Sequence, residues 1–241
     1  MNCGIVIIPT YNEIENVESI VRAVFSLHKS FHVLIIDDNS PDQTAKKVIE
    51  LQKEFPTQLF LEQRAKKSGL GTAYVHGFKW ALQKDYEFIY EMDADFSHNP
   101  NDLEKLYIAC HFDTADLAIG SRYVTGVNVV NWPLSRVLLS YFASVYVRMI
   151  TGMKIMDATA GFICYKRQVL ESINLDKIKF IGYAFQIEMK YRIFAKGFNI
   201  QEVPVIFTDR TKGQSKMSGS IIKEAVFGVL SLRIKKLFNR L

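Results

Sequence analysis

The sequence contains few cysteines, and they follow no recognisable pattern. Cys3, Cys110 and Cys164 are far apart, odd in number and without C-x-x-C or Cys/His spacing. Neither a disulfide framework nor a structural zinc site is therefore indicated. This cysteine usage fits a reducing, cytoplasmic setting.

Long hydrophobic runs are also absent. Residues 5–9 are too few for a signal peptide and lack its basic flank. The longest apolar region, residues 137–150, follows Arg136 and is interrupted by Arg148. Because no uncharged run reaches the roughly 18 residues that a membrane-spanning helix needs, we expect a soluble or peripheral protein.

The glycine pattern of dinucleotide-binding proteins is missing as well. The first apolar run, residues 4–9, leads into T-Y-N-E and not into G-x-G-x-x-G, which disfavours a Rossmann-type oxidoreductase.

Apolar residues make up 49% of the chain and charged residues 23%, as in an ordinary globular protein without repetitive or disordered segments.

Positive charge is concentrated near the C-terminus. The net charge is +5, yet residues 210–241 contain eight Lys or Arg and one acid, Glu224, so this segment carries +7 and the rest about −2. A local basic excess indicates phosphate groups or an anionic membrane surface as partners, and not nucleic acid.

Short apolar segments alternate with segments of helical periodicity, which predicts a doubly wound α/β fold. The expected strands are 4–9, 33–36, 59–62, 88–92, 116–120, 162–165 and 200–207. The expected helices are 12–25 with Asn12 as N-cap, 40–54 with Ser40 as cap and Pro41 at the first position, 72–83, 101–111, 134–149, 183–195 and a C-terminal segment from 218.

Polar and acidic residues follow four of these strands, at 10–13, 37–40, 93–98 and 121–123. Ligands of open α/β sheets bind at the carboxyl edge of the strands, so the four loops predict one site. Asp93 and Asp95 face the same side if strand geometry continues through them. Two hard oxygen ligands suit Mg²⁺ or Mn²⁺ holding a phosphate.

Other residues near these loops fit a nucleotide diphosphate sugar. Asp37 is expected to accept hydrogen bonds from the base or ribose, with Tyr11 and Glu13 beside it. Asp37 or Asp38 serves only as a turn or cap residue in the alternative interpretation. Arg210 and Lys216 are expected to cover the diphosphate. His98 is expected to be a structural hydrogen-bonding residue in preference to a metal ligand.

Two helical segments have two interpretations each. The apolar face of residues 134–149 either packs on the sheet or lines a channel for a lipid tail. The basic, imperfectly amphipathic segment at the C-terminus either docks on its own domain or lies at a membrane surface.

Seven ordered motifs carry a resemblance that covers about residues 4–220. They are P-T-Y-N-E (9–13), I-I-D-D-N-S-P-D-Q-T (35–44), G-L-G-T-A-Y-V-H-G (69–77), M-D-A-D-F-S-H-N-P (92–100), G-S-R-Y (120–123), G-Y-A-F-Q-I-E-M (182–189) and D-R-T-K-G-Q-S-K-M (209–217). The chain resembles the family 2, GT-A fold glycosyltransferases, and within them the short dolichol-phosphate or polyprenol-phosphate mannose synthases.

This resemblance implies a mixed, mostly parallel sheet and a role for each matching residue. Asp93, Asp95 and Arg122 match catalytic positions, and the two carboxylates match the metal ligands. The implied nucleotide-sugar contacts are Pro9, Tyr11, Glu13, Ile35, Asp37, Asp93, Ala94, Asp95, Arg122, Arg210 and Lys216. The implied acceptor-phosphate residues are Arg122, Arg136 and Asp157. Two departures stand out: D-D-N-S replaces the usual D-D-G-S, and W-P-L-S-R (132–136) matches loosely.

The implied reaction transfers mannose from GDP-mannose to dolichyl or polyprenyl phosphate, with inversion and with Mg²⁺ or Mn²⁺. We expect a nucleotide-binding half (1–122), an acceptor half (123–220) and a C-terminal amphipathic helix (221–241). The protein is expected to lie on the cytoplasmic face of a membrane, with or without a membrane-anchoring subunit. Two alternatives stay open: a UDP-glucose or other UDP-sugar donor, and a non-catalytic membrane-binding subunit.

Overall fold

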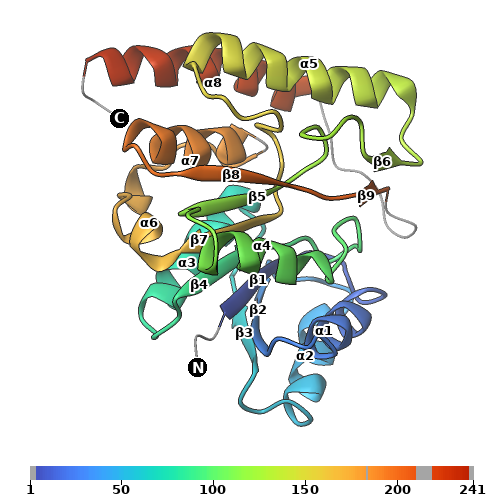
Figure 1. Cartoon of the computed structure of the whole chain (residues 1–241). Helices are drawn as coiled ribbons and strands as arrows, with labels where there is room; N and C mark the ends of the chain where they lie inside the picture. Colours follow the sequence, from blue (N-terminus) through green and yellow to red (C-terminus); the bar gives the residue numbers. More distant parts are fainter. Residues whose placement is uncertain (1–3, 183, 210–218, 239–241) are drawn as a thin grey trace.

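One seven-stranded sheet runs through the part of the chain that the structure describes, residues 4–182, 184–209 and 219–238 of a computed structural model (Figure 1). The strand order is β3-β2-β1-β4-β7-β5-β8. The strands are β1 (Gly4–Thr10), β2 (Phe31–Asp37), β3 (Leu59–Gln63), β4 (Phe88–Glu91), β5 (Leu117–Ser121), β7 (Ile163–Lys166) and β8 (Ile200–Pro204). A second, two-stranded sheet pairs β6 (Val129–Val130) with β9 (Phe207–Thr208).

Helices cover both faces of the large sheet. One face carries α1 (Val17–Phe25), α2 (Thr44–Gln52) and α4 (Asp102–His111), and the other carries α3 (Leu70–Leu82), α6 (Arg167–Glu171) and α7 (Ala184–Ala195). Outside α7 lie α5 (Leu134–Thr151) and α8 (Gly219–Leu237), side by side at the top of Figure 1. A short 3-10 helix, η1, spans Leu175–Lys177.

The expectation of a mixed, mostly parallel sheet is confirmed. Strands β1 to β4 pair in parallel, as do β5 and β8, whereas β7 is antiparallel to both β4 and β5. The loop before β7 is bound to Arg122 at the carboxyl end of β5. Strand β7 begins at that edge and runs back across the sheet.

Two hydrophobic cores explain the continuous apolar runs of the sequence. Successive side chains of a strand point to opposite faces, so Ile5 and Ile7 enter the core under α3 while Val6 and Ile8 enter the core under α1. All four are fully buried. A strand covered on both faces needs apolar residues at every position, as in other parallel sheets.

The predicted starts of the first two helices are wrong. Asn12 has a left-handed backbone (φ 58°), and α1 begins only at Val17. Gln43 is also left-handed (φ 69°), and α2 begins at Thr44 and not at Pro41. In both cases a folded loop at the sheet edge occupies the residues that resemble a capping sequence, because tertiary hydrogen bonds outweigh local propensity there.

Other boundaries differ by less. The helix expected from residue 72 begins at Leu70, and the single strand expected over 200–207 is divided into β8 and β9. The elements α6, η1 and β6 were not predicted, and each is five residues or shorter. Such short elements carry too little periodicity to be recognised.

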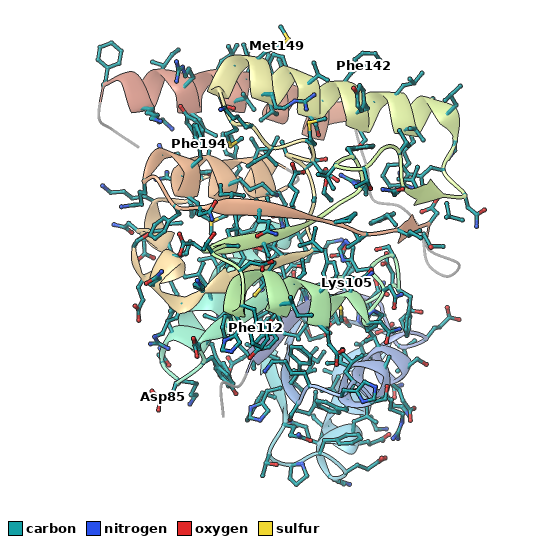
Figure 2. The ribbon with its side chains drawn as sticks, in the orientation of Figure 1. Asp85, Lys105, Phe112, Phe142, Met149 and Phe194 are labelled. Carbon is teal, nitrogen blue, oxygen red and sulfur yellow. The ribbon has the colours of Figure 1, made fainter. Side chains whose placement is uncertain are left out.

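The layer of α5 and α8 has an apolar outer surface. Phe142 and Met149 on α5 are 60% and 77% exposed, and Phe227 on α8 is 71% exposed. Figure 2 shows Phe142 and Met149 on the outer side of this layer. Even so, among the described residues, no helix combines the length and apolar character needed to cross a membrane.

Gly71 in the first turn of α3 provides a test of this packing. A Cβ atom there would lie 2.7 Å from the carbonyl oxygen of Phe180 and 2.7 Å from Cγ of Phe185. We expect Gly71→Ala to lower the free energy of unfolding by about 1–3 kcal/mol in urea denaturation, because backbone cannot move aside cheaply. Glu50→Ala on the exposed side of α2 should change it by less than about 0.5 kcal/mol; equal effects would contradict the packing.

Candidate active site

The two carboxylates of D-A-D lie in an irregular loop. Strand β4 ends at Glu91, and Phe96 has a left-handed backbone (φ 60°). The reason given above for a shared orientation, a strand continuing through Asp95, is therefore wrong. Asp93 is partly exposed and borders a cavity, whereas Asp95 is 7% exposed and accepts a hydrogen bond from the backbone N–H of Ser97 (3.1 Å).

His98 supports this loop from within, as expected. Its Nδ1 accepts a hydrogen bond from the backbone N–H of Asp93 (3.2 Å), and its ring stacks on Phe162 at 4.9 Å. Burial lowers the pKa of His98 to about 4. The imidazole is therefore neutral at physiological pH, as an acceptor at Nδ1 must be.

Arg122 and Asp157 form a buried, bidentate ion pair. Nε and Nη2 of Arg122 each lie 2.6 Å from a carboxylate oxygen of Asp157, and the Arg122 backbone N–H donates to the same group (3.0 Å). Nη2 also donates to Thr159 (2.8 Å). Arg122 is 8% exposed and Asp157 fully buried, so this ion pair belongs to the interior and not to the surface.

The Arg122 charge determines the protonation of Asp157. Burial alone would raise the pKa of Asp157, but the adjacent guanidinium and its hydrogen bonds outweigh burial and hold that pKa below its ordinary value. The backbone N–H groups of Met156 and Asp157 donate to Glu202 on β8 (2.7 and 2.8 Å). The loop that carries Asp157 is thus attached to the sheet edge on two sides.

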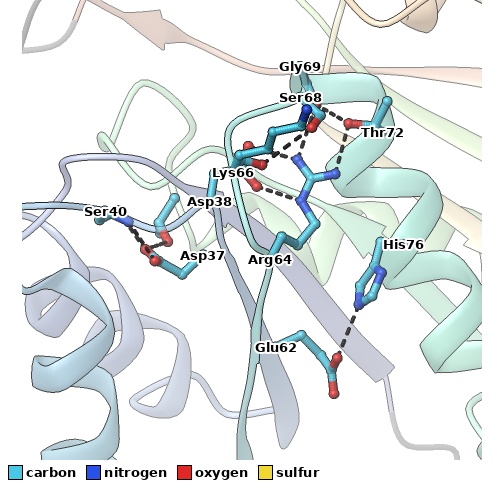
Figure 3. A network of polar contacts seen from close by, with 11 residues as sticks. Asp37, Asp38, Ser40, Glu62, Arg64, Lys66, Ser68, Gly69, Thr72 and His76 are labelled. Carbon is cyan, nitrogen blue, oxygen red and sulfur yellow. Dashed lines mark hydrogen bonds and ion pairs between the residues drawn. The ribbon is translucent and has the colours of Figure 1, made fainter.

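The second-strand loop uses both of its aspartates structurally (Figure 3). Asp37 is fully buried and accepts hydrogen bonds from Thr10 Oγ1 (3.0 Å) and from the backbone N–H and Oγ of Ser40 (2.9 and 2.6 Å). Asp38 accepts from Nε and Nη2 of Arg64 (2.5 and 2.7 Å). Asp37 is therefore the residue that holds the turn, and Arg64 is a partner that the sequence did not reveal.

The first-strand residues differ in exposure. Tyr11 and Glu13 are partly exposed; the ammonium of Lys67 lies 4.3 Å from the Tyr11 ring centre, and Glu13 accepts a hydrogen bond from Asn16 (2.9 Å). Pro9 is partly buried, and Ile35 is fully buried within the core under α1. Only some of the predicted nucleotide contacts thus reach the surface through their side chains.

Arg136 lies on the opposite side of the site. It pairs with Asp209 at 2.8 Å, and its guanidinium carbon lies 4.0 Å from the ring centre of Trp132. Asp209 is the first residue of the basic motif that includes the two predicted loop cations. Arg210 and Lys216 themselves lie outside the residues that the structure describes.

A cavity of about 290 Å³ connects these groups to the outer helices. Its polar end is bordered by Asp93, His98, Arg122, Arg136, Thr159 and Gln186. Its apolar end is bordered by side chains of α5 and α8, namely Leu139, Phe142, Ala143, Tyr146, Val147, Val226 and Val229. The predicted channel face of residues 134–149 therefore has a cavity beside it, although part of the same helix also packs in the core at Val147.

Behind the polar end lies a buried network that sequence reasoning missed. Glu91 accepts hydrogen bonds from Tyr165 (2.6 Å) and from Gln186, and the Lys190 ammonium donates to the carbonyl oxygen of Ala160 (2.6 Å). Burial raises the pKa of Glu91 to about 7, against its hydrogen bonds, and lowers the pKa of Lys190 to about 8. Charged residues inside α7 were the available signal, but they resemble an ordinary solvated face in the sequence.

The candidate ligands for a divalent metal ion are the two D-A-D carboxylates, Asp93 and Asp95. Within the described ranges, no cluster of three or more His, Cys, Asp or Glu side chains is arranged to hold an ion. Two carboxylates alone fit an ion that keeps water and takes further oxygen ligands from a phosphate, as Mg²⁺ does.

A family model described as glycosyl transferase family 2 matches residues 5–173. Polyprenol monophosphomannose synthase of Mycolicibacterium smegmatis is 46% identical over 98% of this chain and 89% of its own length. Undecaprenyl-phosphate mannosyltransferase of Micrococcus luteus is 44% identical over 92% of this chain and 90% of its own length. Dolichol-phosphate mannosyltransferase of Pyrococcus furiosus is 36% identical over 91% of this chain and 60% of its own length.

Solved structures of lower identity share the fold. Glucosyl-3-phosphoglycerate synthase of Mycobacterium tuberculosis superposes with a TM-score of 0.68 at 16% identity, over 99% of this chain and 80% of that one. That structure contains Mn²⁺, uridine diphosphate and glucosyl-3-phosphoglycerate, and another of the same enzyme contains Mg²⁺ and uridine diphosphate. At this identity the likeness establishes the α/β GT-A architecture alone.

The Arg122–Asp157 pair yields a prediction for stability. Asp157→Ala leaves a buried guanidinium without its carboxylate and should lower the free energy of unfolding by about 3–5 kcal/mol. Because the folded-state pKa of Asp157 is lowered, the stabilisation is complete above the unfolded-state pKa of about 3.9 and is lost as the pH falls through the folded-state value.

Urea denaturation of the wild type and the isosteric Asp157→Asn variant between about pH 7 and about pH 3 measures this dependence. The difference in unfolding free energy between the two proteins should shrink toward the acid end. A difference that stays constant over this range would contradict the proposed charge pairing.

Proposed function

Because this chain belongs to glycosyl transferase family 2, we propose that it transfers mannose from a nucleotide sugar to a polyprenyl phosphate. It is a polyprenyl-phosphate mannosyltransferase, and relatives named for that reaction match it over nearly its whole length. One structural observation carries the proposal: a single cavity is lined by the Asp93 carboxylate and two arginines, Arg122 and Arg136, and also by apolar side chains of α5 and α8. A lipid phosphate has the same two-part chemistry.

The donor in this proposal is GDP-mannose. Tyr11 and Glu13, which are partly exposed, contact the nucleotide through their side chains. Pro9, Ile35 and Asp37 act by shaping the loops around it, because Ile35 and Asp37 are fully buried. UDP-glucose or another UDP-sugar stays the alternative donor, since few residues distinguish the nucleotides.

Asp93, Ala94 and Asp95 hold the donor diphosphate in this proposal, and the two carboxylates bind Mg²⁺ or Mn²⁺. When bound, such an ion stabilises the negative charge that develops on the leaving diphosphate. The partly exposed Asp93 faces the cavity, while Asp95 is oriented by the Ser97 backbone. Arg210 and Lys216 cover the diphosphate from the segment that follows Asp209.

The acceptor phosphate lies between Arg122 and Arg136, which both border the cavity. Asp157 contributes through Arg122, whose guanidinium it orients, because its carboxylate is fully buried against that side chain.

The acceptor is already an anion, so no general base is needed. Its oxygen attacks the anomeric carbon opposite the departing diphosphate, and a single displacement inverts the configuration. The buried and paired catalytic side chains argue against a non-catalytic subunit.

The outer surface of α5 and α8 faces a membrane in this proposal. An exposed apolar helix layer beside the opening for a lipid tail fits an interfacial position on the cytoplasmic face. The Lys236 ammonium lies 5.1 Å from the ring centre of Phe194 on α7, so this cation packs on the protein, while Arg233 is exposed. In this proposal the chain is divided into a nucleotide-binding half (1–122), an acceptor half (123–220) and a membrane-facing C-terminal helix (221–241).

Transfer of radiolabelled mannose tests the reaction. Purified protein with GDP-mannose, a polyprenyl phosphate and Mg²⁺ or Mn²⁺ should form a mannosyl lipid, and more slowly or not at all with UDP-glucose. Asp95→Asn should lower the rate by about a hundredfold or more, because it removes charge stabilisation from the leaving group. Asp85→Asn, an exposed site away from the cavity, should be unchanged. Transfer that survives in Asp95→Asn would contradict the assignment.

Flotation with vesicles containing anionic lipid tests the membrane surface. A Met149→Glu, Phe227→Glu variant places two charges on the α5 and α8 layer and should bind vesicles at least about tenfold less, because charge insertion opposes apolar burial. Phe112→Glu is a matched control, since Phe112 is 72% exposed at the end of α4, away from that layer (Figure 2). Equal flotation of all three proteins would show that the outer surface of α5 and α8 does not attach this chain to vesicles.

A further inference from the structure

Gln186 lies at the polar end of the cavity and has no place in the function described so far. It is on the first turn of α7, is 2% exposed, and borders the cavity together with Asp93 and Arg122. Residue 161 opposite it is glycine, and a Cβ atom there would lie 3.4 Å from the Gln186 amide nitrogen. The absence of a side chain at position 161 keeps one side of the amide uncovered.

The orientation of the Gln186 amide is determined by Glu91. Nε2 of Gln186 donates to one carboxylate oxygen of Glu91, and the other oxygen accepts from the hydroxyl of Tyr165 (2.6 Å). Because Gln186 and Tyr165 each donate to a different oxygen of Glu91, the amide nitrogen points toward Glu91 and the amide oxygen points away from it. The amide oxygen is consequently the atom of this amide that Glu91 leaves without a hydrogen bond.

That oxygen, Oε1, is buried and has no hydrogen-bond partner in the described part of the chain. Buried polar atoms are almost always hydrogen-bonded, and leaving one unsatisfied destabilises the fold. An oriented but unsatisfied acceptor at the edge of a cavity therefore points to a ligand that donates a hydrogen bond there.

The chemistry of the substrates limits which group can donate a hydrogen bond to Gln186 Oε1. The acceptor phosphate and the donor diphosphate present acceptor oxygens, and an isoprenoid chain has no polar hydrogen. The remaining donors are the N–H and hydroxyl groups of the nucleoside and the hydroxyls of the transferred sugar. The proposed nucleoside contacts, Tyr11 and Glu13, do not line the cavity. The transferred sugar must lie between the two phosphate groups, near Asp93 and Arg122, which line the cavity together with Gln186. We propose that Gln186 Oε1 accepts a hydrogen bond from a hydroxyl of the transferred sugar and so contributes to sugar specificity.

This inference rests on the proposed mannosyl transfer and adds a role for the network behind it. Glu91 is a positioning residue: it holds the amide through Nε2 and is held in turn by Tyr165. Since Glu91 also ends the strand that leads into Asp93, the sugar contact and the diphosphate loop share one support. A sugar without the matching hydroxyl would leave the buried amide oxygen unpaired.

The test uses GDP-mannose and a set of GDP-deoxymannose donors, each lacking one sugar hydroxyl. With the wild type, removal of one particular hydroxyl should lower kcat/KM by about tenfold or more. Gln186→Met, which keeps the length but not the amide, should lose a similar factor with GDP-mannose. It should lose less than about twofold further when that hydroxyl is absent, because the contact is already gone.

Gln168→Met is the matched control, because the exposed Gln168 amide also donates to a carboxylate, that of Asp116 (3.0 Å). It should show the wild-type dependence on every hydroxyl. Tyr165→Phe, which loosens Glu91 without touching the cavity, should reduce the discrimination at the same hydroxyl only.

Two results would overturn the inference alone. In the first, Gln186→Met retains the full wild-type loss for every deoxy donor. In the second, its defect disappears on raising Mg²⁺, which would make Oε1 a metal ligand. In each of these cases mannosyl transfer itself persists. No transfer by the wild type from any donor would instead remove the proposed function, and the inference with it.

Discussion

The buried pair between Arg122 and Asp157 is the interaction on which the site depends. It joins the end of β5 to the loop before β7, and that loop is held from the other side by Glu202 of β8. A charged group this deeply buried is tolerated only when it is paired and hydrogen-bonded. The pair therefore holds the Arg122 guanidinium in one position at the cavity, with its charge balanced by Asp157.

The polar end of the cavity is assembled from separated parts of the chain. Asp93 comes from the loop after β4, Arg122 follows β5, and Gln186 belongs to α7. Their supports are equally dispersed, since Glu91 binds both Tyr165 and Gln186 while Lys190 binds the carbonyl of Ala160. In the proposed reaction this rigidity matters, because a displacement between two anionic groups requires both to be oriented before they react.

The apolar end follows a different physical rule. Some apolar residues of α5 and α8 border the cavity, and others are exposed on the outer surface. Phe142 borders the cavity and is also exposed. A helix layer that is apolar on two sides is costly in water unless one side is covered. The proposed lipid substrate and membrane surface would cover these two sides, which accounts for the composition of both helices.

Much of the fold followed from patterns in the sequence. Continuous apolar runs marked the buried strands, and periodicity marked α3 and α5, because burial on one or two faces demands such patterns. Polar residues after β1, β2, β4 and β5 indicated which sheet edge carries the site. The turns at Asn12 and Gln43 could not be predicted, since their left-handed backbones depend on loops that meet only in the folded protein.

By itself, then, the sequence determined the longer strands and helices, the sheet edge and the identity of the charged residues there. Tertiary structure alone decided the distant partners of these carboxylates: Asp37 with Thr10, Asp38 with Arg64, and Asp157 with Arg122. It also decided that the Gln186 amide oxygen stays unsatisfied within the described residues while its nitrogen binds Glu91. The physical reason is that hydrogen bonds and desolvation depend on distances between residues far apart in the chain, which periodicity and motif spacing do not encode.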